Sequence, residues 1–310
     1  MYILTTMDLS QLKKKAAEMR IVALKAINKA GSGHTGSSMS LMDILVALYY
    51  GTGSSVDNEG VPSGDYGKCC VGKGRGAYGV GREEDKDCII LSKGHGCPAQ
   101  YAILADQGYF PKEELDHLRQ VGALLQGHPT VKIPGIAVAT GSLGQGFAAA
   151  HGIALSLKLD SFGVGADKRD NKVFVVLGDG ELQEGLVWET AMAAAHYNSD
   201  NLIAIVDNNG LQIDGPVRAV MNVDPIQDKF ESFGWKVIRV TDGHNFEQLL
   251  TAIDKARRVE RRPVCIWCKT IKGKGVPFAE NKVSYHGVAL SDQEMEAAHD
   301  ELCRVMGECE

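Results

Sequence analysis

The sequence predicts an α/β protein built on a doubly wound, mainly parallel sheet with helices on both faces. Its strongest apolar runs are continuous rather than alternating, as in strands that are buried on both faces. Segments with helical periodicity lie between those runs, as the crossover connections of a parallel sheet require. With 310 residues, of which 44% are hydrophobic, the chain is long enough to bury the core of such a fold.

Five apolar runs are the expected strands, and they lie at residues 87–91, 173–178, 201–207, 235–240 and 264–270. The expected helices cover about residues 8–30, 38–50, 182–197 and 245–260. Gly31 directly follows the first helix, where a glycine commonly forms a left-handed C-terminal cap. Residues 51–87 are glycine-rich, polar and without periodicity, so we expect one domain over 1–310 with an insertion at about 51–87.

Charge and composition argue against several classes of protein. The net charge of -6 and the pI near 5.9 disfavour nucleic acid or an anionic membrane as a partner, because both require clustered positive charge. No apolar stretch reaches about 18 residues, the length of a membrane span, and the start of the chain turns polar too early for a secretory signal. We therefore expect a cytoplasmic protein that binds neither nucleic acid nor membrane.

The eight cysteines are expected to be free thiols, because their spacing follows no disulfide framework and the chain is not small. Cys265 and Cys268 have the spacing of a redox or zinc pair. However, the surrounding "PVCIWCKT" has the apolar character of a buried strand, and no second pair accompanies it. A structural role is therefore the better interpretation.

Acidic and amide residues follow two of the expected strands. Asp179 stands between two glycines directly after the strand at 173–178, and Asn208 and Asn209 follow the strand at 201–207. In open α/β sheets, ligands bind beyond the carboxyl ends of the strands, so these loops are expected to be neighbours. Carboxylate and amide oxygens suit a magnesium ion that is shared with phosphate oxygens. "GDG" alone is more often a turn, but with an Asn-Asn after a second apolar strand it becomes specific.

This pairing resembles the diphosphate and metal motif of thiamine diphosphate enzymes. Further segments extend the likeness, namely "GSGHTGSSMS" (31–40), "LSKGHGCPAQYAIL" (91–104), "QGHPT" (126–130), "TGSLGQG" (140–146), "GDGELQEGLVWE" (178–189) and "SYHG" (284–287). In this order they resemble the N-terminal, diphosphate-binding half of transketolase over nearly the whole chain. The likeness implies the thiamine diphosphate-binding fold. Because full-length transketolases continue into a pyrimidine-binding domain and a further domain, the chain resembles the N-terminal subunit of a split transketolase.

The resemblance assigns roles to individual residues. It makes Asp179, Asn209 and the backbone carbonyl of Leu211 the ligands of Mg²⁺, or of Ca²⁺ or Mn²⁺ in its place. The residues it implies for thiamine diphosphate binding are His95, Gly141, Leu143, Gly178, Asp179, Gly180, Glu181, Asn209 and His286. The residues it implies around the reacting carbons are His34, His95, His128 and His286. Glu184 and Glu189 are implied to connect paired active sites through water, although the helix dipole alone also favours acidic residues there.

The implied reaction transfers a two-carbon ketol unit from a ketose phosphate to an aldose phosphate. The cofactor supplies an electron sink, and the protein supplies orientation and proton transfer. Histidine titrates near neutrality and can donate or accept hydrogen bonds, so a cluster of histidines suits that task. The remaining histidines are expected to be structural or solvated, and they are His117, His151, His196, His244 and His299. "KGKG" at 272–275 lacks the spacing of a nucleotide-binding loop and is expected to be a mobile connector near the site.

The implied partner is a C-terminal transketolase subunit that carries the pyrimidine-binding domain, in a heterotetramer of two plus two chains. That half supplies the glutamate that activates the aminopyrimidine and most sugar phosphate contacts. Three alternatives stay open: a split transketolase for a sulfonated or branched ketose, an enzyme like 1-deoxyxylulose-5-phosphate synthase, and a non-catalytic relative without the metal site. The intact Asp179 and Asn209 speak against the last.

Overall fold

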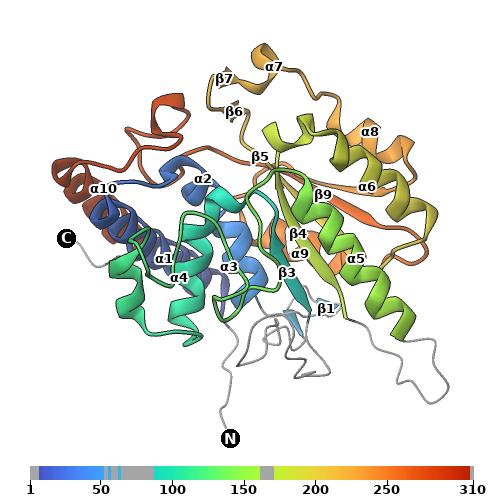
Figure 1. The fold of residues 1–310 in the computed structure, drawn as a ribbon, viewed down its shortest axis with the longest axis horizontal. Coiled ribbons are helices and arrows are strands. Elements are labelled where there is room, and N and C mark those ends of the chain that lie inside the picture. The colour runs from blue at the N-terminus through green and yellow to red at the C-terminus, as the bar shows by residue number, and fades with distance from the viewer. Residues whose placement is uncertain (1–6, 52–54, 57–61, 64–86, 161–170, 308–310) are drawn as a thin grey trace, which may run out of the picture.

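The computed structural model describes residues 7–51, 55–56, 62–63, 87–160 and 171–307, so most of the expected insertion at 51–87 lies outside the described residues. Its central feature is a five-stranded parallel sheet with the strand order β3-β4-β5-β9-β8. Helices cover both faces of this sheet (Figure 1). The predicted doubly wound α/β fold is confirmed.

The strands of this sheet are β3 (Cys88–Leu91), β4 (Val173–Gly178), β5 (Leu202–Asn208), β8 (Lys236–Val240) and β9 (Val264–Lys269). The short antiparallel pairs are β1 (Ser55–Val56) with β2 (Pro62–Ser63) and β6 (Leu211–Gln212) with β7 (Gly215–Pro216). The α-helices are α1 (Leu9–Ala30), α2 (Thr35–Ser40), α3 (Met42–Tyr50), α4 (Cys97–Asp106), α5 (Gln145–Asp160), α6 (Gly185–His196), α7 (Val217–Val220), α8 (Ile226–Ser232), α9 (Phe246–Arg257) and α10 (Asp292–Met306). The 3₁₀ turns are η1 (Gly94–Gly96), η2 (Lys112–His117), η3 (Gly180–Gln183) and η4 (Val283–Tyr285).

The sheet separates two apolar cores. Along β4, Phe174 and Val176 belong to the core that includes α1, α3, α4, α9 and α10. Val173, Val175 and Leu177 belong to the opposite core, beneath α5, α6 and α8. Side chains alternate between the two faces of a strand, and both faces are covered, so every position of β4 is buried. This is why the strands are continuous apolar runs in the sequence.

The first helix follows its predicted signals. Asp8 and Gln11 form a capping box at its N-terminus, and Gly31 adopts the left-handed conformation at its C-terminus with φ 60°. The helix expected at 38–50 is divided instead, because the chain changes direction at Leu41 between α2 and α3. Helical periodicity does not detect such a break when both pieces are buried on every side.

The paired cysteines of β9 lie in different cores. Cys265 belongs to the core beneath α5 and α6, and Cys268 belongs to the core beneath α1 and α3. Residues three apart on a strand point to opposite faces, so the two sulfur atoms cannot bind one metal ion or form a disulfide. Burial raises the pKa of both thiols, and both are free cysteines.

Candidate active site

The register of the sheet brings the motif loops to one edge. Gly178 of β4 pairs with Asp207 of β5, and Asp207 pairs with Cys268 of β9. Asp179 therefore leaves β4 beside Asn208, the last residue of β5, which in turn pairs with Lys269 at the end of β9. This is the edge at which open α/β sheets bind ligands.

Asp179 is buried at this edge with 2% of its surface exposed. Its Oδ1 accepts a hydrogen bond from the Gly180 amide at 2.9 Å, and its Oδ2 accepts one from the Gly210 amide at 2.5 Å. With the amide of Asn208 oriented to satisfy its neighbours, Nδ2 also donates to Asp179 Oδ2 at 2.8 Å. Burial nevertheless raises the pKa of Asp179 to about 6. The ionised carboxylate is therefore less favourable here than in water.

Lys272 supplies a cation that sequence reasoning missed. It lies within "KGKG", for which the sequence predicts only a connector, yet it is 2% exposed. Its Nζ donates to the Leu211 carbonyl at 3.1 Å and contacts His286 Nδ1 at 2.7 Å. Burial, with the nearby Lys93, lowers the pKa of Lys272 to about 8. The sequence did contain one signal for this cation, because Lys272 closely follows a buried strand at the edge where such sheets bind ligands.

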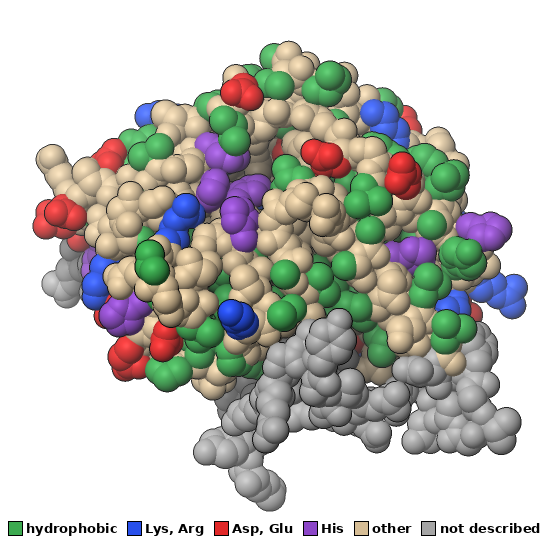
Figure 2. Space-filling view, viewed as in Figure 1, with side chains coloured by type: hydrophobic (Ala, Val, Ile, Leu, Met, Phe, Trp, Pro, Cys, Tyr) green, Lys and Arg blue, Asp and Glu red, His purple; other side chains and the backbone are tan. Residues whose placement is uncertain are grey.

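Three predicted histidines pack against one another at this edge. The ring centroids of His34 and His95 are 5.0 Å apart, those of His34 and His286 are 5.4 Å apart, and those of His95 and His286 are 5.5 Å apart. Figure 2 shows histidine side chains gathered on one part of this face. The three residues come from segments that are distant in the chain, and they meet because these segments lie at the same edge of the sheet.

Burial keeps these three histidines neutral. It lowers the pKa of His34 to about 4 and that of His286 to about 3, and it lowers the pKa of His95 well below its ordinary value. A lysine ammonium has no acceptor, so His286 Nδ1 is the acceptor in its contact with Lys272. The ring proton of His286 is then on Nε2, where it is available to an oxygen of a ligand.

His128 lies on the loop that joins η2 to α5 and is exposed. Its ring is so close to Gly141 that a Cβ there would lie 2.8 Å from His128 Cδ2. The Arg119 guanidinium lies over Gly127, where a Cβ would be 2.5 Å from it. Burial and the charge of Arg119 together lower the pKa of His128. The loop thus presents a neutral histidine and an arginine on the open side of the site.

The Glu181 carboxylate links three motif segments through hydrogen bonds. Its Oε1 accepts from the Ser92 hydroxyl at 2.5 Å and from the Gly144 amide at 2.9 Å, and its Oε2 accepts from the Gly178 amide at 3.0 Å. The residue is 2% exposed, and its carboxylate is directed to these groups within the chain. Gly178 and Glu181 therefore both shape the cleft, with Glu181 doing so through hydrogen bonds to the backbone.

Close backbone approach joins the remaining motifs. A Cβ on Gly94 would lie 2.8 Å from the Gly141 nitrogen, so the segment with His95 and the segment with Gly141 and Leu143 are in direct contact. Beneath them, Asp207 forms a buried ion pair with Lys93 and accepts from the Ser40 hydroxyl at 2.6 Å. This buried network fixes the loops that carry the predicted site residues.

The predicted glutamates and the histidines expected to be structural differ in their distance from this edge, and Glu184 lies beside Gly144, where a Cβ would be 3.1 Å from Glu184 Cβ. Glu184 and Glu189 are exposed at the start and on the face of α6. His151 is buried on α5, and its Nε2 is 3.1 Å from the Ser199 hydroxyl. The structural roles predicted for His151 and His244 agree with their contacts, since His244 bonds Asp43 within the fold.

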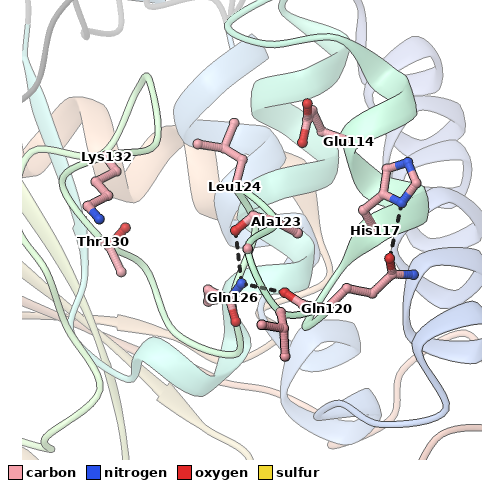
Figure 3. Close-up of a pocket in the computed structure, with 10 residues that line it drawn as sticks. Glu114, His117, Gln120, Ala123, Leu124, Gln126, Thr130 and Lys132 are labelled. Atoms are coloured by element: carbon pink, nitrogen blue, oxygen red, sulfur yellow. Dashed lines mark hydrogen bonds between the residues drawn. The ribbon is translucent and has the colours of Figure 1, made fainter.

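A separate hollow of about 820 Å³ lies beside the loop that leads to His128 (Figure 3). Gln126 closes the turn next to it, because its Nε2 donates to the carbonyls of Gln120 and Ala123 at 2.9 Å each. None of the predicted site residues lines this hollow. Its relation to the site is therefore indirect, through the shape of the loop.

Comparison with known proteins identifies the family. The family model of the transketolase thiamine diphosphate binding domain matches residues 82–304. The 6-deoxy-6-sulfo-D-fructose transketolase subunit SqwG of Clostridium sp. (strain MSTE9) is 38% identical over 94% of this chain and 96% of its own length. One of the subunits of the apulose-4-phosphate transketolase from Phocaeicola vulgatus is 32% identical over 95% of both chains. Human transketolase is 37% identical over 91% of this chain but only 40% of its own length.

A solved structure of a transketolase also matches this chain. The transketolase of Campylobacter jejuni superposes with a TM-score of 0.82 and 29% sequence identity, covering 98% of this chain and 44% of that one. The chain therefore belongs to the transketolase family and matches its N-terminal, thiamine diphosphate-binding part. Within that family it corresponds to the N-terminal subunit of a transketolase that is divided between chains, as in the two bacterial relatives.

Two further observations concern the predicted partners. No helix in the described part of the chain is long and apolar enough to cross a membrane. The described residues also contain no group of three or more His, Cys, Asp and Glu side chains that could hold a metal ion by themselves. A metal ion at Asp179 would therefore require oxygen ligands of another kind.

Proposed function

We propose that this chain, acting with a separate C-terminal subunit, transfers a two-carbon ketol unit from a ketose phosphate to an aldose phosphate with thiamine diphosphate and a divalent metal ion. The observation that carries this proposal is the meeting of Asp179 and Lys272 with three packed, neutral histidines at one sheet edge. Residues 1–310 form one diphosphate-binding domain with an insertion at about 51–87, and the enzyme acts in the cytoplasm.

The oxygen atoms at this edge fit a magnesium ion. Asp179 supplies a carboxylate, Asn209 an amide oxygen and Leu211 a backbone carbonyl, and Mg²⁺, Ca²⁺ and Mn²⁺ all accept such ligands. Burial alone raises the pKa of Asp179 to about 6, and a bound cation would reverse this shift by favouring the ionised carboxylate. Phosphate oxygens of the bound cofactor would supply further oxygen ligands.

The cleft also fits a diphosphate. Gly178 and Gly180 allow backbone amides to approach it closely, and Lys272 adds a buried positive charge. The hydroxyls of Ser37 and Ser38 and the Nδ1 of His34 are buried without a hydrogen-bond partner in the described part of the chain. Buried polar groups are normally paired, so these atoms suit a polar ligand. The remaining cofactor contacts are His95, Gly141, Leu143, Glu181, Asn209 and His286.

The histidines supply orientation and proton transfer. When bound, thiamine diphosphate contributes the electron sink that carbon–carbon cleavage requires. His34 and His95 are neutral, so each can accept a proton from a sugar hydroxyl or donate a hydrogen bond to one. His286 is also neutral, but its Nδ1 already accepts from Lys272, so its role is to donate a hydrogen bond from Nε2. His128, on the exposed loop, orients the donor's terminal hydroxyl, and Arg119 adds positive charge beside it.

The partner subunit supplies the other wall of the site. It carries the pyrimidine-binding domain and the glutamate that activates the aminopyrimidine, so this chain alone is inactive. Each site lies between two chains, which gives a heterotetramer of two plus two. The exposed Glu184 and Glu189 lie on α6 at that interface and connect paired sites through water.

A specialised donor is the second candidate function. It is favoured by the 38% identity to a subunit named for 6-deoxy-6-sulfo-D-fructose and the 32% identity to one named for apulose 4-phosphate. The residues described above bind the cofactor or act near the donor's terminal hydroxyl and reacting carbons, and none of them is assigned to the distal part of the sugar. The donor is therefore decided mainly by the partner subunit.

The test compares turnover by the chain alone with turnover by the chain and its pyrimidine-binding partner. Magnesium, thiamine diphosphate and an aldose phosphate are supplied, and fructose 6-phosphate, 6-deoxy-6-sulfofructose and apulose 4-phosphate are compared as donors. We expect ketol transfer only with the partner present. Equal turnover without the partner would contradict the split enzyme, and no turnover with any donor would contradict ketol transfer.

A further inference from the structure

A tight turn at residues 242–244 places His244 against residues 269–271, where the chain leaves β9. The Asp242 carboxylate accepts from the His244 amide at 2.9 Å, which closes the turn. The Gly243 amide donates to the Lys269 carbonyl at 2.7 Å. A Cβ on Gly243 would lie 2.6 Å from Thr270 Cγ2 and 2.9 Å from that carbonyl, so only glycine allows this approach.

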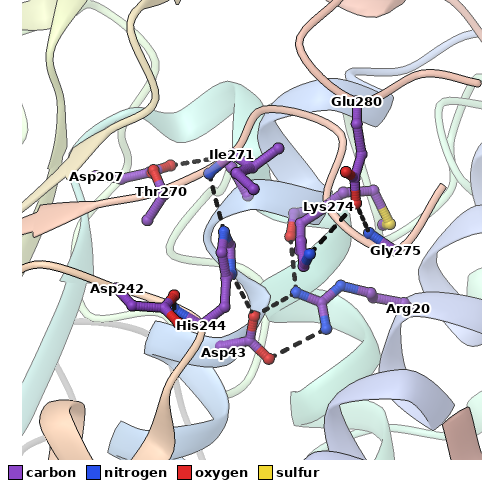
Figure 4. Close-up of polar contacts among 12 residues, drawn as sticks. Arg20, Asp43, Asp207, Asp242, His244, Thr270, Ile271, Lys274, Gly275 and Glu280 are labelled. Atoms are coloured by element: carbon purple, nitrogen blue, oxygen red, sulfur yellow. Dashed lines mark hydrogen bonds and ion pairs between the residues drawn. The ribbon is translucent and has the colours of Figure 1, made fainter. Parts of the chain in front are cut away.

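The ring of His244 bridges this segment to the core. The Ile271 amide donates to His244 Nε2 at 2.9 Å, and His244 Nδ1 lies 2.7 Å from an oxygen of Asp43 (Figure 4). A backbone amide can only donate, so Nε2 is the unprotonated nitrogen and Nδ1 donates its proton to Asp43. The side chain is 9% exposed, and both nitrogens are used.

The other end of the bridge is fixed in two helices. Arg20 of α1 donates to both oxygens of Asp43 of α3, at 3.1 Å and 2.5 Å. Arg20 also donates to the Met39 carbonyl at 3.1 Å. Burial tends to raise the pKa of Asp43, but Arg20 and His244 hold it at about 2, so the carboxylate is ionised. The His244 ring is therefore held in place by a buried carboxylate that is itself fixed by Arg20.

The segment that His244 holds leads directly to Lys272. Thr270 is bound on its other side, because its hydroxyl donates to Asp207. The chain is thus fixed at two successive residues immediately before Lys272, whose ammonium must reach both the Leu211 carbonyl and His286. A displacement of this segment would withdraw the ammonium from the cleft.

We propose that His244 is a positioning residue for Lys272, holding the Ile271 amide so that the lysine ammonium faces the diphosphate of the cofactor. The proposal rests on the proposed function, since it takes Lys272 as a cofactor-facing group. Asp43 and Arg20 serve as the anchor, and none of these three residues contacts the cofactor itself. His244 therefore acts on cofactor binding through Lys272 and on the reaction only through the cofactor.

The first test measures amide exchange in the purified chain alone. His244→Asn retains a donor near the position of Nδ1, for Asp43, but is too short to accept from Ile271. We expect exchange at Ile271 and Lys272 to accelerate about tenfold or more, since the amide loses its acceptor. His151→Asn removes a buried histidine hydrogen bond elsewhere and serves as the matched control. Unchanged exchange in His244→Asn would overturn the proposal, whatever the enzyme proves to transfer.

The second test is a double-mutant cycle on thiamine diphosphate affinity in the assembled enzyme with magnesium. We expect His244→Asn to weaken binding about two- to tenfold, the range for one neutral hydrogen bond, and His151→Asn to leave it unchanged. In a Lys272→Met background, His244→Asn should have no further effect. An equal loss in both backgrounds would overturn the proposal, because His244 would then act independently of Lys272. Failure of ketol transfer itself is detected separately, by the turnover assay.

Discussion

The two ends of the cleft are built in different ways. At the diphosphate end, Asp179 and Lys272 are each 2% exposed and Asn209 is 7% exposed. Their positions follow from the register of β4, β5 and β9 and from hydrogen bonds to neighbouring loops. At the substrate end, His128 and Arg119 are exposed on a loop.

The difference shows which part of the site this chain completes by itself. At the proposed diphosphate end the charged groups are already enclosed and held by this chain's own contacts, so we expect binding there to require little reorganisation. At the proposed substrate end, His128 and Arg119 are exposed within the described part of the chain. Changes at the first end should therefore act on cofactor affinity, and changes at the second should act on turnover.

The largest expected effect is at Asp179. Asp179→Ala removes the only carboxylate among the predicted metal ligands, so magnesium-dependent thiamine diphosphate binding in the assembled enzyme should be abolished. Calorimetric titration of the cofactor, with and without magnesium, measures this. Burial disfavours the ionised Asp179 carboxylate, which offsets the hydrogen bonds from Gly180, Gly210 and Asn208 that the variant loses, so without metal the variant should melt at about the same temperature as the parent. Unchanged cofactor affinity would show that the metal lies elsewhere.

A smaller effect is expected at the substrate end. His128→Ala should lower donor turnover by roughly 10²-fold or more, the scale for a lost proton-transfer or orienting group. Cofactor affinity should stay close to normal, because His128 is on the exposed loop. Steady-state kinetics and cofactor titration on the same preparation separate the two quantities. A loss of cofactor affinity instead would place His128 at the diphosphate end.

Lys272→Met tests the diphosphate end from its other side. It removes a buried positive charge while keeping most of the side-chain volume, so it should weaken thiamine diphosphate binding by roughly ten- to a hundredfold. Lys236→Met is the matched control, because Lys236 is exposed at the start of β8, at the opposite end of the strands. Titration of the cofactor into both variants measures the difference. Equal affinities would mean that the Lys272 ammonium faces only His286 and Leu211.

The sequence predicted the strands of the sheet, the place of Asp179 at its carboxyl edge and the cluster of histidines there. Continuous apolar runs identified all five strands, because both faces of the sheet are covered. The motif loops predicted that Asp179 lies at the carboxyl edge and, through the family resemblance, that histidines cluster there. His34, His95 and His286 do pack together in the structure.

Other features depend on contacts that no local pattern encodes. Lys272 lies in a polar, glycine-rich segment that resembles an exposed loop, and only the fold buries it against His286. Glu181, for which the family resemblance predicts a cofactor contact, also accepts hydrogen bonds from Ser92, Gly144 and Gly178, and no sequence pattern predicts these. The bonds from Ser92 and Gly144 join residues distant in the chain, and they appear only once the register of the strands is known.

The smallest expected effect is on the pH dependence of stability. A variant of His34 tests the contribution of this one histidine of the cluster. Burial lowers the pKa of His34 to about 4 from an ordinary value of 6.5, so below pH 6.5 the unfolded chain binds a proton that the folded chain excludes. The stability that His34 contributes is therefore complete above pH 6.5 and is lost as the pH falls towards 4. The raised pKa of Asp179 has the opposite effect on stability, but it is common to parent and variant.

We expect the urea midpoint of His34→Asn to fall less steeply than that of the parent between pH 7 and pH 5. The control His196→Asn, at the exposed end of α6, should keep the parental slope. Identical slopes in all three proteins would mean that His34 is solvated rather than enclosed, and the cleft would then be open at both ends.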